Sequence, residues 1–470
     1  MTTETPPRTT PNVRLPMLGV LFGLLLAMLD NFIVGTALPS VLNELGGAPV
    51  LSWVVTAYTL TAAATTPIWG KLGDLYGRKR MILTAVGLFV VGSVLAAIAP
   101  TMGMLIGARV VQGIGAGGLA VSAFAVIGDL VPPRERGKYQ GMVAIVVAAG
   151  TIGGPLLGGF LTDALSWRWA FLINLPLGIL TLVWVALSLH VKHERRRARI
   201  DWIGAMLLVV SLSAVVLIST WAGSAFPWFS PQAIALVVVA VVSLAAFVWQ
   251  ERRAPEPLLP LRIFATRNFT MAAVLALVSG VILFACVLYL PLFQQNVQGV
   301  SASVSGLLLL PMMIPVVIAS QVAGRIMSVT GRYKILPIIG TASAVLGSVL
   351  LATMTTTTPV ALTACFMVLM GIASGLTQQM TTTIAQNSVE HRDIGAASGA
   401  VTMVRTAGGS IAVAIFGSIY AAHTSGLATG ALEPGIAASV SQIFVIVAVV
   451  AALGLAAALT LRETPLRGTR

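Results

Sequence analysis

Asp30 and Arg109 are the two residues whose charge and position most directly suggest chemistry. Asp30 lies in the run Leu15 to Leu38, an otherwise apolar stretch long enough to span a bilayer. A charged side chain at such a depth costs at least about 2.5 kcal/mol, so it usually faces a pathway or a charged partner. Arg109 lies at a similar depth in another apolar stretch. We therefore predict that Asp30 and Arg109 form a direct or water-mediated pair.

This pair has two interpretations. Burial favours the neutral form of a carboxyl group, whereas a nearby cation favours the ionised form. If the contact between Asp30 and Arg109 changes with conformation, Asp30 can bind and release a proton, and a cationic substrate can compete with that proton. In the other interpretation, a permanent pair only fixes helix packing. The sequence favours the proton-coupling role.

The segment Gly70 to Arg80 (GKLGDLYGRKR) predicts a conformational latch. Gly70 and Gly77 allow a tight turn between two helices, and Asp74 and Arg78 can pair with groups on neighbouring helices. Asp129, at the end of the fourth apolar stretch, is the expected partner. Such a network would hold one conformation and break in another. The alternative is a turn with solvated charges that only sets membrane topology.

Three glycines in AGTIGGPLLGGFL recur every four residues: Gly150, Gly154 and Gly158. Small residues at this spacing form one stripe along a helix and let a neighbouring helix approach closely. Pro155 adds a kink. We interpret the stripe as a packing motif, and a tightly packed, kinked helix between two halves of a transporter would also limit leak.

Arg405 is the only deeply placed charge in the second half of the chain. Together with Tyr58, Gln294 and Gln378, it is a candidate for lining a substrate pathway. Polar residues at ordinary helix contacts are an equally good interpretation of the two glutamines. An aromatic ring such as that of Tyr58 can offer its face to a lipophilic cation.

Metal, cofactor and enzyme chemistry have no support in the sequence. Cys286 and Cys365 both fall within apolar stretches, and the four histidines lie near stretch ends or in loops. A GxxxxGK[ST] loop for ATP is absent from the sequence. The apolar stretches contain no buried nucleophile, metal cluster or carboxylate pair. We therefore expect no metal, no cofactor and no enzymatic activity.

The elements that must position these residues are membrane-spanning helices. The chain is 57% hydrophobic and 9% charged, unlike a soluble domain. About fourteen apolar segments are long enough to cross a bilayer. Their approximate bounds are 15–37, 51–70, 81–100, 103–126, 139–161, 169–190, 203–222, 231–250, 269–293, 304–324, 335–353, 361–383, 397–420 and 441–461.

The distribution of positive charge sets the expected topology. With both termini inside, 25 of the 28 Lys and Arg residues fall in tails and inner loops, and Arg168 alone falls in an outer loop. The net charge of +13 therefore indicates orientation and contact with membrane lipids, not nucleic-acid binding. The basic run 190–199 is best explained as an inner-leaflet anchor.

An internal repeat predicts two related bundles. Gly70 to Arg80 is echoed by 324–334 (GRIMSVTGRYK), and 131–141 (VPPRERGKYQG) is echoed by 389–399 (VEHRDIGAASG). Similar offsets indicate a duplicated six-helix unit. The expected organisation is a disordered tail (1–14), an N-terminal bundle (15–190), a linker with two inserted lipid-facing spans (191–268), a C-terminal bundle (269–461) and a second tail (462–470).

Several motifs together resemble one family. The turn at Gly70–Arg80 is similar to the signature loop of the major facilitator superfamily. LIGARVVQGIGAGG (105–118) and AGTIGGPLLGGFL (149–161) resemble its fourth-helix and fifth-helix motifs. LDNFIVGTALP (29–39) and WRWAFLINLPLG (167–178) resemble its fourteen-helix drug/proton antiporters. The resemblance implies that Arg109 takes part in proton coupling, and it covers all predicted spans.

The sequence therefore predicts a proton-coupled antiporter that exports hydrophobic, often cationic compounds by alternating access. A single amphipathic cavity near the bilayer midplane would accept them. The alternative is a dedicated exporter of one endogenous metabolite, antibiotic or lipid. An Ala-, Gly-, Val- and Arg-rich composition suggests a bacterial inner (plasma) membrane. No obligate protein partner is indicated.

Overall fold

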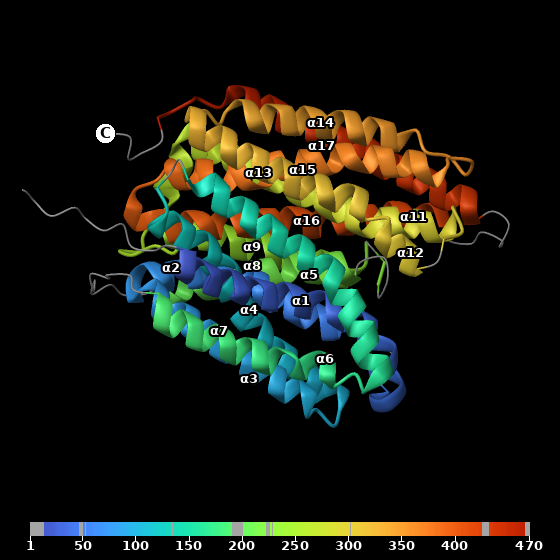
Figure 1. Ribbon diagram of the computed structural model, residues 1–470, viewed down its shortest axis with the longest axis horizontal. Helices are drawn as coiled ribbons and strands as arrows, with labels where there is room; N and C mark the ends of the chain where they lie inside the picture. The colour runs from blue at the N-terminus through green and yellow to red at the C-terminus, as the bar shows by residue number, and fades with distance from the viewer. Residues whose placement is uncertain are drawn as a thin grey trace, which may run out of the picture.

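The computed structural model describes residues 14–46, 50–51, 53–132, 135–189, 201–221, 226–227, 229–300, 302–424 and 432–465. Regular structure in these residues is helical, which confirms the all-α prediction, and the helices run roughly along the long axis of the molecule (Figure 1). The predicted tail 1–14 is described only at Arg14, and the tail 462–470 only as far as 465. The basic run 190–199 lies outside the described residues.

Two groups of helices account for most of the chain. The N-terminal group consists of α1 (Arg14–Leu45), α2 (Trp53–Tyr76), α3 (Arg78–Ala97), α4 (Met102–Leu130), α5 (Arg136–Ala164), α6 (Trp169–Leu172) and α7 (Asn174–Ser188). The C-terminal group consists of α10 (Arg267–Phe284), η3 (Ala285–Tyr289), α11 (Leu290–Asn296), α12 (Ala302–Leu307), α13 (Leu310–Thr330), α14 (Ile335–Ala352), α15 (Val360–Asn387), η4 (His391–Asp393), α16 (Ile394–Thr424) and α17 (Leu432–Thr460). The inserted elements are α8 (Trp202–Trp221), α9 (Pro231–Glu251) and η2 (Leu261–Ala265).

Twelve helices in the described chain are long and apolar enough to cross a membrane, and a shorter apolar helix covers Trp202–Ile218. The remaining predicted span is occupied by α2, whose threonines, Lys71 and Asp74 make it more polar than the others. Helices therefore stand at all fourteen predicted places, but the count of fourteen spans stays a prediction. The domain limits at 190 and 269 also stay predictions.

Local sequence sets several helix ends. Thr101 accepts a hydrogen bond from the backbone N–H of Met104 at the start of α4, which is a typical N-cap. Gly77, with φ of 94°, separates α2 from α3, and Gly331, with φ of 69°, ends α13. Both glycines have a positive φ that other residues rarely adopt. Their ψ angles of 138° and 0° differ, so the two share a positive φ but not one backbone conformation, and their predicted equivalence stays a prediction.

The groups meet along two seams: α2 packs against α16, and α5 packs against α13. Helix α8 lies at the first seam, in contact with α2 and α16, and its Leu208 is buried in a core shared with the C-terminal group. Helix α9 packs on α8 and exposes large apolar side chains, including Val238 and Val241. The expected lipid-facing position thus fits α9, whereas α8 contributes to the interior.

Candidate functional site

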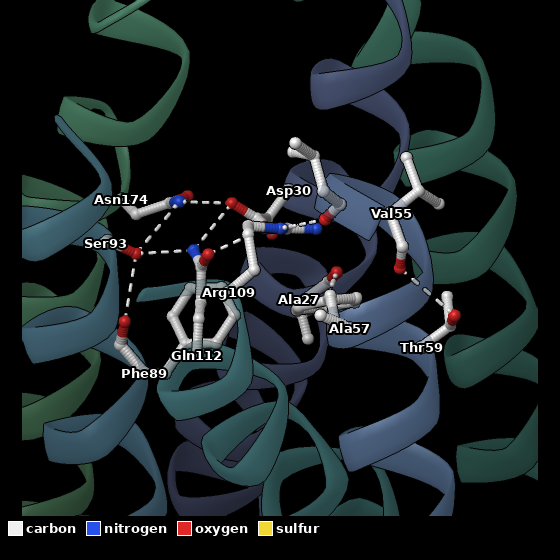
Figure 2. Close-up of polar contacts among 12 residues, drawn as sticks. Ala27, Asp30, Val55, Ala57, Thr59, Phe89, Ser93, Arg109, Gln112 and Asn174 are labelled. Carbon is white, nitrogen blue, oxygen red and sulfur yellow. Dashed lines mark hydrogen bonds and ion pairs between the residues drawn. The ribbon is translucent and has the colours of Figure 1, made fainter. Parts of the chain in front are cut away.

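Asp30 and Arg109 form a direct ion pair inside the N-terminal group. Arg109 Nη1 donates to Asp30 Oδ2 at 2.5 Å, and both side chains are 0% exposed. Figure 2 shows the carboxylate of α1 meeting the guanidinium of α4. The predicted contact is therefore confirmed, while its role in proton coupling stays a prediction.

Three neutral polar side chains complete the network around Asp30. Gln112 Nε2 and Asn174 Nδ2 each donate to Asp30 Oδ1 at 2.7 Å, and both also donate to Ser93 Oγ (Figure 2). These residues were not predicted from the sequence. Gln112 lies three residues after Arg109 on α4, and a polar residue at that spacing within an apolar span was the available signal.

Arg109 is also bound by α2. Its Nε donates to the backbone oxygen of Val54 at 3.0 Å, and its guanidinium lies 4.1 Å from the centre of the Tyr58 ring. Tyr58 is only 4% exposed and donates to the backbone oxygen of Ala27. Tyr58 therefore packs against the ion pair from within the bundle, instead of presenting its ring to an open pathway as expected. Its place in substrate recognition stays a prediction.

Two atoms of this network have no hydrogen-bond partner among the described residues. They are Arg109 Nη2, a donor, and Asn174 Oδ1, an acceptor. Buried polar atoms are nearly always satisfied, so each exception calls for a physical reason. A water molecule or a change of partner during transport would satisfy them. Each of the two atoms can therefore take a further partner.

A second charged cluster lies at the end of the bundle where the basic loops gather, called here the basic end. Arg78 donates to Asp74 and, through Nε at 2.7 Å, to Asp129 Oδ2. The arginine side chain is 6% exposed, and the carboxylates are 8% and 13% exposed. The three predicted latch residues are thus brought together.

The cluster joins the two groups of helices. Asp74 accepts hydrogen bonds from the backbone N–H groups of Gly395 and Ala396, at the first turn of α16. A carboxylate is well placed there because the start of a helix carries unpaired N–H donors and a partial positive charge. Gln386 Nε2 adds a bond to the backbone oxygen of Phe124 in α4. The molecule is therefore closed at its basic end.

Gly70 and Gly77, both predicted as turn glycines, have different roles. Only Gly77 lies in the turn, because α2 continues to Tyr76. Gly70 lies within α2, and a Cβ there would come within 2.6 Å of the backbone oxygen of Gly395. Gly70 is thus a site of close approach between α2 and α16, not a turn residue. Sequence spacing alone placed the end of this helix too early.

The segment that follows α9 is attached to both groups at the same end. Lys71 of α2 pairs with Glu256 at 3.2 Å, and Arg262 pairs with Asp393, just before α16, at 2.8 Å. Glu251 fixes the segment by accepting the backbone N–H groups of 258 and 259. Residues 252–266, called here the bridging segment, therefore span the seam beside the Arg78 cluster.

The glycine stripe of α5 faces α1. A Cβ on Gly150 would lie 2.6 Å from Met28 Cβ, one on Gly154 2.5 Å from Phe32 Cβ, and one on Gly158 2.3 Å from Thr36 Oγ1. The close helix contact predicted for small residues at this spacing is thus present. It lies within the N-terminal group, on the helix that carries Asp30. Pro155 is inside α5 and exposed.

A different part of α5 faces the C-terminal group. A Cβ on Gly141 would lie 2.7 Å from Gln321 Oε1 of α13, and Ala148 belongs to a core cluster of the C-terminal group. The helix therefore does stand between the groups, as expected. The limit on leak that is predicted for α5 would depend on the face that carries Gly141 and Ala148, and not on the face that carries the glycine stripe.

The polar candidates of the C-terminal group are separated. Gln294 is 0% exposed and accepts a hydrogen bond from Ser305 Oγ, so it is buried away from any surface. Arg405, 8% exposed, lies beside α15 and contacts the backbone oxygen of the partly exposed Gln378 at 3.4 Å. Arg405 and Gln378 are thus neighbours, whereas Gln294 belongs to another contact.

The opposite end of the N-terminal group carries an exposed polar pocket. Glu44 and Trp167 line it, with Ser40, Asn43, Thr162 and Ser166. Hydrogen bonds from Arg168 and Trp167 hold the pKa of the Glu44 carboxyl below its ordinary value. This pocket does not include Asp30 or Arg405, and the predicted central cavity stays a prediction.

Buried charge networks in a bundle of membrane-length helices are those of a multi-pass membrane protein. A model of the Major Facilitator Superfamily matches residues 20–413. The chain is 37% identical over 474 residues to an uncharacterized MFS-type transporter of Mycobacterium tuberculosis, covering 95% of this chain and 69% of that protein. It is 37% identical over 403 residues to Multidrug resistance protein 3 of Bacillus subtilis, covering 86% of this chain and 78% of that protein.

Solved structures agree on the fold. The human organic anion transporter MFSD10 matches with a TM-score of 0.66 and 15% identity, covering 94% of this chain and 100% of that one. The proton:xylose symporter XylE matches with a TM-score of 0.62 and 16% identity, covering 93% and 94%. The chain belongs to the Major Facilitator Superfamily and is a transporter, not an enzyme.

Proposed function

We propose that this transporter is a proton-coupled antiporter that exports hydrophobic, often cationic compounds by alternating access. The observation that carries the proposal is the fully buried Asp30–Arg109 pair. Isolated charges are expensive inside a membrane, and buried ion pairs are sensitive to the loss of either partner. Protonation of Asp30 would remove its negative charge and free Arg109 to exchange partners.

The hydrogen bonds around the pair offer a route for this exchange. Arg109 Nη1 already bonds to Gln112 Oε1 at 2.6 Å as well as to Asp30. A neutral Asp30 would weaken one of these bonds and leave the other, so the guanidinium could move without losing all its partners. Such movement would shift α4 relative to α1 and alter the packing of the N-terminal group.

The contacts at the basic end support alternating access. The positive-inside rule places this end in the cytoplasm, and the Asp74–α16 bonds close it. In this arrangement, Asp30 would bind a proton from the opposite side. After the basic end opens, Asp30 would release its proton there. Each cycle would then carry a proton inward and substrate outward. The relatives named for multidrug resistance and efflux support the direction of transport.

The test is Asp30→Asn in purified protein reconstituted into vesicles. Asparagine keeps the size and hydrogen-bonding ability of the side chain but cannot carry a titratable charge. We expect this variant to be expressed and folded, with lower stability because Arg109 keeps an uncompensated charge, and to lose substrate-induced proton movement across a panel of cationic and neutral compounds. Glu44→Gln is the matched control, because Glu44 lies outside the network, and it should retain proton movement. Proton movement retained by Asp30→Asn would overturn the proposal.

A further inference from the structure

Arg405 is a buried cation without a counterion among the residues that the structure describes. It lies eleven residues past the start of α16, roughly 16 Å along the helix, and is 8% exposed. Its Nη2 contacts two neutral oxygens, the Gln378 carbonyl at 3.4 Å and Thr382 Oγ1 at 3.5 Å. Its Nε has no partner among the described residues. Both contacts are at the long limit of hydrogen bonding.

The other buried arginines are bound much more completely. Arg109 meets Asp30 at 2.5 Å, and Arg78 meets Asp129 at 2.7 Å. Within the described residues, no carboxylate lies within 4 Å of Arg405, since its recorded contacts are only the two neutral ones. A guanidinium presents five N–H donors in a planar fork that matches a carboxylate. Most of that fork is therefore available.

The face of α15 beside Arg405 is polar but neutral. Ser374, Gln378 and Thr382 recur every four residues, so they share one side of the helix, and Arg405 contacts two of them. Ser374 Oγ is buried without a partner in the described structure. Gln378 is partly exposed. The surroundings thus offer further hydrogen-bonding groups and contribute no negative charge.

We propose that Arg405 binds a carboxylate group of the exported compound. The substrate class is then an amphipathic molecule that carries a carboxylate, either as an acid or as a zwitterion. This inference rests on the proposed export function and restricts its substrates to hydrophobic compounds that carry a carboxylate, so that a cationic substrate would be a zwitterion. Because Asp30 and Arg109 neutralise each other, Arg405 leaves the two buried sites with a net positive charge, which favours an anionic group over a purely cationic ligand.

The experiment compares two probes: a xanthene dye with a free carboxylate and the methyl ester of the same dye. Binding is measured by fluorescence polarisation to the full chain in nanodiscs of phosphatidylcholine. We expect wild-type protein to prefer the acid, and Arg405→Gln to weaken binding of the acid at least about tenfold with binding of the ester unchanged, because a charged hydrogen bond contributes about 1.5–3 kcal/mol. Arg405→Lys should retain part of the preference.

Arg325→Gln, which removes an exposed arginine of α13, is the matched control and should leave both affinities unchanged. Equal affinity of the wild-type protein for acid and ester, or equal weakening of both by Arg405→Gln, would overturn the proposal. Nanodiscs containing phosphatidylglycerol test the lipid headgroup as the source of the anion. The proposal would be overturned if the acid no longer bound in these nanodiscs and phosphatidylglycerol bound directly to wild-type protein but not to Arg405→Gln protein. The site would then belong to a lipid headgroup. Binding requires no proton transport, so it is independent of the outcome for Asp30→Asn.

Discussion

Asp30 and Arg109 form a buried pair in which each charge compensates the other. The carboxylate accepts from Arg109 and Gln112 of α4 and from Asn174 of α7, so two neighbouring helices hold it in place. Removing one charge from such a pair leaves the other buried without compensation, which costs more than removing both. The interaction energy between the two charges can therefore be separated, by single and double substitutions, from the contribution of each side chain.

At the residue scale, we predict that Arg109→Gln lowers the free energy of unfolding by about 3–5 kcal/mol. Asp30→Asn combined with Arg109→Gln should recover part of this loss, because no uncompensated charge remains. Asp30→Asn alone completes the double-mutant cycle, and its coupling energy reports the charge interaction, because both variants without Arg109 lose the contacts with Val54 and Tyr58. The measurement is unfolding in detergent followed by intrinsic fluorescence. Strictly additive effects would show that the pair is not energetically coupled.

The contact between Asp30 and Arg109 could be predicted from the sequence, but the polar residues that support it could not. A rise of about 1.5 Å per residue places Asp30 and Arg109 at similar depths, and that was enough to predict their contact. Depth does not say which way a side chain points around its helix. Ser93 and Asn174 therefore looked like ordinary polar residues, although both belong to the network.

At the element scale, close packing of α5 on α1 fixes the helix that carries Asp30. The stripe Gly150, Gly154 and Gly158 was predictable because its spacing is a property of the helix itself. The position of Gly70 was not predictable in the same way. Its role depends on how far α2 continues and on α16, which is more than 300 residues later in the sequence.

The glycine contact predicts a sharp difference between adjacent residues. A Cβ on Gly154 would lie 2.5 Å from Phe32 Cβ, whereas one on Gly153 would lie 3.6 Å from Leu29 Cδ2. We expect Gly154→Ala to reduce stability by about 1–3 kcal/mol through overpacking. Gly153→Ala should be neutral or stabilising by up to about 1 kcal/mol, because alanine favours helix. Thermal unfolding of the two variants would check this, and equal stabilities would refute it.

At the scale of the whole molecule, the two groups are joined at the basic end by side chains from distant parts of the sequence. The internal repeat predicted two related bundles, and the family match confirms a major facilitator transporter. The place of the bridging segment at the seam was not predicted. The apolar sequence of the inserted helices α8 and α9 indicates only that these helices can contact lipid. Its ion pairs with Lys71 and Asp393 depend on the assembled structure.

For this closure we predict that Arg78→Gln slows turnover more than it weakens substrate binding. Loss of Arg78 leaves the buried Asp74 and Asp129 without their shared cation, so the arrangement closed at the basic end becomes less stable. A loss of about 1.4 kcal/mol corresponds to about a tenfold slower rate. Transport and binding assays on the same preparation measure both effects. Arg80→Gln, at an exposed neighbouring position, is the control, and weakened binding with normal turnover would contradict the latch.

The bridging segment makes opening at the basic end, and with it the transport rate, depend on ionic strength. Arg262 has a side-chain exposure of 57%, so its pair with Asp393 is open to screening, whereas the Arg78 cluster is largely shielded. Salt on the basic side would therefore loosen the bridging segment before it affects the latch. Opening at that end should become easier as salt rises, and Arg262→Gln should reduce this dependence. A change in ion concentration on that side would then alter the transport rate without contact with either substrate or proton.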